Sequence, residues 1–75
     1  MSVVSETVEF PSSSNLASAS YEPDSDNLTI EFRDGSSYTY MNVPPAAYRG
    51  LCNAGSAGEY FARQIKGRYN YERMD

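Results

Sequence analysis

Residues 28–43 read LTIEFRDGSSYTYMNV, and this stretch decides the fold. Its first six residues alternate between apolar and polar side chains, which is the period of a strand that buries one face. Asp34 and Gly35 follow, and this pair strongly favours a hairpin turn. Residues 36–43 then return as the partner strand. The stretch therefore predicts an antiparallel hairpin.

The length of the hairpin loop decides which face carries Tyr38 and Tyr40. A loop of two residues places both rings opposite the apolar face of the first strand, where they could stack on nucleic-acid bases. A loop of three residues, closed by a left-handed Gly35, sends both rings into the core. In that register Tyr40 pairs with Leu28, and the preceding tyrosine with Ile30. We favour this longer loop, because the shorter one would bury small polar side chains in place of two rings.

One more strand is expected before the hairpin, over residues 16–21, where small and larger side chains alternate. Residues 1–11 carry Val4, Val8 and Phe10 in phase and form either an edge strand or an N-terminal arm. Residues 12–75 make up the domain proper, so the division that we expect is an arm followed by one α+β domain.

Two short helices are expected after the hairpin. The first runs over residues 45–53 and places Cys52 on its buried face, where a small apolar side chain fits. The second begins at a capping box, in which Ser56 accepts from the backbone of Glu59, and it ends before Gly67. The predicted fold is α+β, a small three-stranded antiparallel β-meander followed by two short helices packed on one face.

Length and composition indicate a small domain with a thin core. A chain of 75 residues buries only about 60% of its unfolded surface. A single cysteine excludes an intramolecular disulfide and suits a reducing compartment. No apolar run approaches the roughly 20 residues that span a bilayer, and the first residues lack the pattern of a signal peptide. We expect a cytoplasmic protein that makes no membrane contact.

Order and spacing of several motifs carry a resemblance to a known family. Tyr38 and Tyr40 form a central Tyr-x-Tyr, Val-Pro follows at residues 43–44, and residues 65–69 read Ile-Lys-Gly-Arg-Tyr. This pattern resembles the KTSC domain, which is found alone in bacterial and phage proteins and at the C-terminus of some lysyl-tRNA synthetases. The resemblance covers about residues 10–73 and implies RNA binding. Family members often carry a histidine where this chain has Gln64, so no role for an imidazole is transferred.

Positive charge is concentrated near the end of an acidic chain. The net charge is −4, yet the segment IKGRYNYER at residues 65–73 holds three cations interleaved with two tyrosines. Cations bind phosphates and aromatic rings stack on bases, so a surface of this composition suits single-stranded RNA or a nucleotide. The candidate binding residues are Arg63, Lys66, Arg68, Tyr69 and Tyr71, with Tyr38 and Tyr40 as further stacking candidates.

A structural explanation of the same cluster is also open. Arg63 and Lys66 complement the negative end of a helix dipole, and Tyr69 and Tyr71 could close the core. The acidic balance of the chain, with pI ≈ 4.6, also differs from the basic profile of most nucleic-acid-binding domains. The alternative function is therefore a protein-interaction or oligomerising domain, for example a phage protein that binds a host protein or a second copy of itself.

Catalysis is not expected. The chain has no histidine, which excludes Ser-His and Cys-His dyads and histidine metal clusters. The acidic turn at residues 24–27 lacks the glycine and the closing glutamate of a calcium loop. We therefore expect no catalytic residue, no metal and no cofactor. The catalytic alternative is a nuclease without histidine, built from Arg, Lys, Tyr and Glu.

Overall fold

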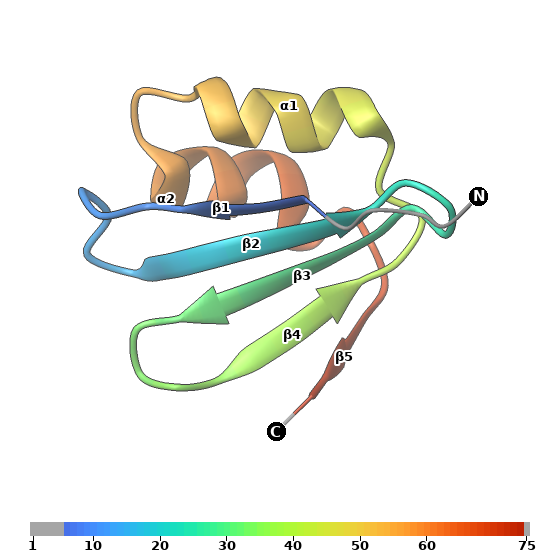
Figure 1. The fold of residues 1–75 in the computed structure, drawn as a ribbon, viewed down its shortest axis with the longest axis horizontal. Coiled ribbons are helices and arrows are strands. Elements are labelled where there is room, and N and C mark those ends of the chain that lie inside the picture. The colour runs from blue at the N-terminus through green and yellow to red at the C-terminus, as the bar shows by residue number, and fades with distance from the viewer. Residues whose placement is uncertain (1–5, 75) are drawn as a thin grey trace.

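The computed structural model describes residues 6–74 and consists of one sheet with helices on one of its faces (Figure 1). The sheet has five strands in sequential order, and every neighbouring pair is antiparallel. The elements are β1 (Glu6–Glu9), β2 (Leu16–Glu22), β3 (Asn27–Phe32), β4 (Ser37–Tyr40), α1 (Pro45–Asn53), α2 (Ala57–Tyr60), η1 (Phe61–Ile65) and β5 (Tyr71–Arg73). The α+β class is confirmed, as is the placement of the helices on one face.

The predicted count of three strands is wrong, because a short strand is added at each edge of the sheet. β1 lies along β2, with Val8 opposite Ala19. β5 lies along β4, with Tyr71 opposite Tyr40. After forming the helices, the chain therefore returns to the sheet and adds a strand at its edge. Of the expected arm over residues 1–11, residues 6–9 form β1, and residues 1–5, including Val4, lie outside the described part of the chain.

The hairpin has the predicted three-residue loop. Tyr40 lies opposite Leu28 and Tyr38 opposite Ile30, so both rings share the face that the helices cover. The Phe32 amide donates to the Ser36 carbonyl at 2.9 Å, and Gly35 has a φ of +95°. This left-handed conformation is easily reached only by glycine.

The core lies between the sheet and the helices. It is formed by apolar and aromatic side chains from every element except β1, α2 and β5, together with residues of the connecting loops: Phe10, Leu16, Ala19, Tyr21, Leu28, Ile30, Tyr40, Val43, Tyr48, Leu51, Phe61 and Ile65. The Tyr21 hydroxyl links this core to two loops by hydrogen bonds. It lies 2.7 Å from the Val43 carbonyl and 2.9 Å from a carboxylate oxygen of Asp26.

Helix α1 has the predicted bounds but not the predicted buried set. Tyr48 and Leu51 point into the core, whereas Cys52 is exposed, so its assignment as a buried side chain is wrong. Cys52 lies at the margin of the apolar stripe, about 70° from the centre set by the two buried residues at 100° per residue. None of the elements within residues 6–74 covers that margin, since Cys52 is exposed there.

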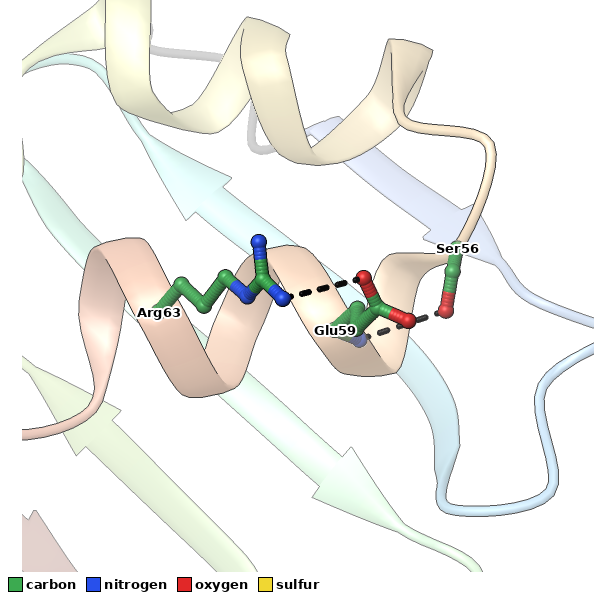
Figure 2. A network of polar contacts seen from close by, with 3 residues as sticks. All are labelled: Ser56, Glu59 and Arg63. Atoms are coloured by element: carbon green, nitrogen blue, oxygen red, sulfur yellow. Dashed lines mark hydrogen bonds and ion pairs between the residues drawn. The ribbon is translucent and has the colours of Figure 1, made fainter.

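The second helix combines α2 with the wider turn η1. Ser56 accepts a hydrogen bond from the Glu59 amide at 3.3 Å, as the capping box predicts (Figure 2). The Glu59 carboxylate extends along the helix to Arg63, at 3.8 Å from its guanidinium. In η1 the Lys66 amide donates to the Phe61 carbonyl at 2.8 Å, a spacing of five residues that defines a π-turn. Gly67, with a φ of +82°, then turns the chain as predicted.

Among residues 6–74, no helix has the length and apolar character needed to cross a bilayer.

Candidate functional site

An open pocket of about 340 Å³ lies between η1, the β3–β4 hairpin and β5. Its walls combine five aromatic rings with four polar or charged side chains. The aromatic residues are Phe32, Tyr38, Tyr40, Phe61 and Tyr71, and the others are Asn15, Asp34, Ser36 and Lys66.

The five rings form a connected array in which most neighbouring pairs are edge-to-face and the Tyr40–Tyr71 pair is tilted. Phe61 of η1 stands over the sheet with its ring centroid 5.5 Å from those of Phe32 and Tyr40. The Tyr71 ring of β5 lies 5.6 Å from Tyr38 and 5.4 Å from Tyr40. Such distances and tilted planes are favourable for aromatic pairs, so each ring is supported by at least one other.

The pocket is open because the helices cover only part of this sheet face. Tyr40 lies under Phe61 and is only 4% exposed, whereas Tyr71, on the next strand, is 56% exposed. Burial raises the pKa of the Tyr40 hydroxyl, so this group is neutral at physiological pH. The aromatic surface therefore runs from the buried core to solvent across two adjacent strands.

The loops at one end of the sheet supply three of the four polar or charged residues of the pocket, Asn15, Asp34 and Ser36. One carboxylate oxygen of Asp34, Oδ1, accepts from the Ser36 hydroxyl at 2.7 Å and from its amide at 2.9 Å. These hydrogen bonds lower the pKa of Asp34, so the carboxylate is ionised at neutral pH. Asn15 lies beside this loop, because its carbonyl accepts from the Arg33 amide at 3.0 Å. Lys66 reaches the pocket from the end of η1.

Four of the residues singled out in the sequence meet at this pocket. Tyr38, Tyr40, Lys66 and Tyr71 all line it. The pairing of β5 with β4 produces this arrangement, because it places alternate residues of the tail beside the Tyr-x-Tyr strand.

The other three predicted site residues lie outside the pocket lining. Arg63 is exposed on the helix and paired with Glu59 (Figure 2). Arg68 folds back onto the helix, where its side-chain Nε donates to the Arg63 carbonyl at 3.2 Å. Tyr69 is half-buried against the core. The two arginines therefore form an exposed basic pair at the end of the helix.

Sequence reasoning missed Asn15, Asp34 and Arg73 as neighbours of the rings. The Arg73 guanidinium lies over the Tyr38 ring at 5.7 Å from its centroid, a cation–π distance. Tyr71 and Arg73 are two residues apart, so they share one face of β5. This period of two was the sign in the sequence that the tail forms a strand.

The chemistry available at the pocket is recognition of a flat or apolar group. Aromatic faces can stack on the ligand, Asp34 and Asn15 can hydrogen-bond its edge, and Lys66 can pair with a negative charge. Within the described range 6–74, no group of three or more His, Cys, Asp or Glu side chains is placed to hold a metal ion.

Comparison with known proteins gives concordant results. Residues 12–69 match the model of the KTSC domain. A lysine–tRNA ligase of Nostoc punctiforme is 42% identical over 64 residues, which are 85% of this chain but 11% of the ligase. A small protein of Stutzerimonas stutzeri is 39% identical over 84% of this chain and 90% of its own length.

The fold is also found in a solved structure. The crystal structure of a KTSC domain protein from Yersinia pestis superposes with a TM-score of 0.87 at 33% identity, covering 96% of this chain and all of that one. Sequence, family model and three-dimensional structure agree, and the chain belongs to the KTSC domain family.

Proposed function

We propose that this domain binds single-stranded RNA or a nucleotide, with one base in the aromatic pocket. The observation that supports this most strongly is the meeting of three tyrosines and Lys66 in one open pocket. Stacking of a base on an aromatic ring contributes about 1–3 kcal/mol, and lysine pairs with phosphate. The domain has no catalytic step in this proposal, and it acts as a binding module.

The exposed basic pair extends the proposed contact surface. Arg63 and Arg68 lie at the end of the helix that carries Lys66, and a hydrogen bond joins them. A strand of RNA with one base in the pocket would place its neighbouring phosphates on these cations. Because the chain as a whole carries a charge of −4, binding depends on this local cluster and weakens steeply with salt.

The relatives give this proposal a biological context. Several of them are ligases that act on lysine and tRNA, and the chain spans only 11% of their length. The ligation reaction is therefore not transferred to this domain. An appended module that contacts RNA fits an enzyme whose substrate is a tRNA.

Titration of short, labelled single-stranded RNA at two salt concentrations tests the proposal. The wild-type domain should bind at low salt, and replacing Arg63, Lys66 and Arg68 together with alanine should weaken binding and flatten its salt dependence. Tyr71→Ala should weaken binding without unfolding the domain, because this ring is exposed. Arg49→Ala is the matched control, since Arg49 is an exposed cation on α1 outside the pocket.

Three results would contradict the proposal. They are a wild-type domain that binds no RNA or nucleotide at low salt, an Arg49 variant that loses as much affinity as the triple variant, and cleavage of the RNA. The last would favour the nuclease alternative. Cleavage is followed on a denaturing gel at the end of each titration.

A second candidate function is protein interaction through the β5 edge. Tyr71 and Met74, at 56% and 58% exposed, are the large hydrophobic side chains that the described residues leave in solvent. Both belong to or adjoin an edge strand, and edge strands pair readily with another chain. Light scattering tests one form of this candidate. A dimer that Tyr71→Ala converts to monomer would favour self-association through β5.

A further inference from the structure

We propose that the pocket selects guanine over the other bases. This inference rests on the proposed function, since it specifies which base the aromatic pocket accepts. Its basis is that Asp34 and Asn15, from two loops joined by the hydrogen bond of the Arg33 amide to the Asn15 carbonyl, both line the pocket beside the rings.

The dimensions of the pocket limit the ligand to about one nucleotide. Ligand pockets occupy roughly 300–1,000 Å³, and this one has about 340 Å³. Its walls are mostly aromatic rings, which contact a planar base well. A single base is therefore the unit that the pocket reads, and the rest of a strand runs outside it.

The carboxylate of Asp34 is held in place to accept hydrogen bonds from a base edge. Both hydrogen bonds from Ser36 fall on Oδ1, and they fix the direction of the carboxylate plane. Oδ2 receives neither of the Ser36 hydrogen bonds, and the Arg73 guanidinium also acts on this carboxylate electrostatically. An ionised carboxylate is a strong acceptor without donors of its own, so a ligand donor would compete for Oδ2. A base that presents two neighbouring donors gains most from such a group.

Guanine has the edge that matches this pair of residues. It presents the O6 acceptor beside the N1–H and N2–H₂ donors, so its donors face Asp34 while O6 accepts from the Asn15 amide. In adenine, cytosine and uracil, the donor on the base edge lies next to an acceptor. When that donor faces the carboxylate, the neighbouring acceptor faces the carboxylate as well. Negative charge facing a lone pair is repulsive, so these bases lose affinity at the same position.

Lys66 completes the recognition of a nucleotide. It lines the same pocket but comes from the end of η1, not from the loops that carry Asn15 and Asp34. The base edge and the phosphate are thus recognised by groups from different elements. A 5′-monophosphate should therefore bind more tightly than the corresponding nucleoside, and Lys66→Ala should remove that difference.

Titration with the four ribonucleoside 5′-monophosphates, followed by amide chemical shifts, tests the base preference. GMP should bind about tenfold more tightly than AMP, CMP or UMP, the scale at which a good paired contact discriminates between bases. Shifts should map to Asp34, Ser36 and Tyr71.

Asp34→Asn provides the sharper test. Asparagine keeps an Oδ1 that can accept from Ser36, and it replaces the other oxygen with an amide donor. Xanthine carries a carbonyl where guanine has N2–H₂. The variant should therefore lose about tenfold in affinity for GMP and gain affinity for XMP, while Ser37→Ala, outside the pocket, changes neither. Melting temperatures establish that each variant is folded.

The possible outcomes separate the two proposals. Equal affinity for all four monophosphates, with loss on Tyr71→Ala, would overturn the guanine preference and leave the nucleotide-binding function standing. A GMP preference that Asp34→Asn leaves unchanged would also overturn the inference. Failure of every nucleotide and of short RNA to bind would overturn both proposals.

Discussion

Gly50 is a residue of α1 that packs directly against a side chain of α2. It lies in α1 against the ring of Tyr60 from α2, and a Cβ atom at this position would come within 2.6 Å of the Tyr60 Cζ atom. From the sequence, a glycine inside a helix indicates only weak helical propensity. The structure shows instead that the absence of a side chain makes room for the neighbouring ring.

The sign of the stability change caused by Gly50→Ala tests that interpretation. In an open helix the change would stabilise the protein by about 1 kcal/mol. Here we expect a loss of about 1–3 kcal/mol, the usual effect of overpacking, measured by urea denaturation. In a Tyr60→Ala background the same change should become stabilising. An increase in stability in the wild-type background would show that Tyr60 moves aside without cost.

Among the helices and strands, the sequence predicted those features that depend on residues close together in the chain. The Asp34–Gly35 turn and the burial preference of Tyr38 and Tyr40 together specified the hairpin register, and Gly67 marked the end of the helix. β5 was missed because its pairing with β4 joins residues about thirty positions apart, and the period of two shared by Tyr71 and Arg73 is a weak signal in a strand of three residues. The pocket depends on that pairing for Tyr71, and the sequence singled out four of its nine lining residues: Tyr38, Tyr40, Lys66 and Tyr71.

Phe61→Ala tests the contact between the second helix and the sheet. Phe61 contacts both Phe32 and Tyr40, at 5.5 Å between ring centroids, and is 4% exposed. Its removal should cost about 3–5 kcal/mol, enough to unfold a domain of this size. Phe61→Leu, which keeps most of the apolar volume, should remain folded. Circular dichroism melting curves distinguish the two, and a near-normal melting temperature for Phe61→Ala would contradict the core assignment.

For the molecule as a whole, tyrosine supplies much of the core and sets its response to alkaline pH. Burial, together with Asp26, raises the pKa of Tyr21 to about 12, and burial also raises the pKa of Tyr40 and Tyr48. In the unfolded chain the tyrosine pKa is about 10. The folded state therefore binds these protons more tightly, which stabilises the domain fully below pH 10.

The expected result is a loss of stability as the pH rises from about 10 to about 12. Urea midpoints across this range, with tyrosinate absorbance as a second readout, measure the effect. Tyr21→Phe should be less stable at pH 8, because it loses the hydrogen bond to Val43, but its stability should fall less between pH 10 and 12. A parallel decline in both proteins would exclude Tyr21 as a source of the effect.

The three-residue strand β5 also has a kinetic consequence. It is held by few backbone hydrogen bonds, among them the one from the Met74 amide to the Ser37 carbonyl at 2.8 Å, and all three of its residues are exposed. Short exposed edges open locally at far lower free energy than the global unfolding transition. The Met74 amide should therefore exchange with deuterium much faster than amides in the central strand β3. Tyr71 on this strand lines the pocket. The proposed ligand would therefore bind the form in which β5 is paired with β4, and saturation with that ligand should slow exchange at Met74 more than at β3.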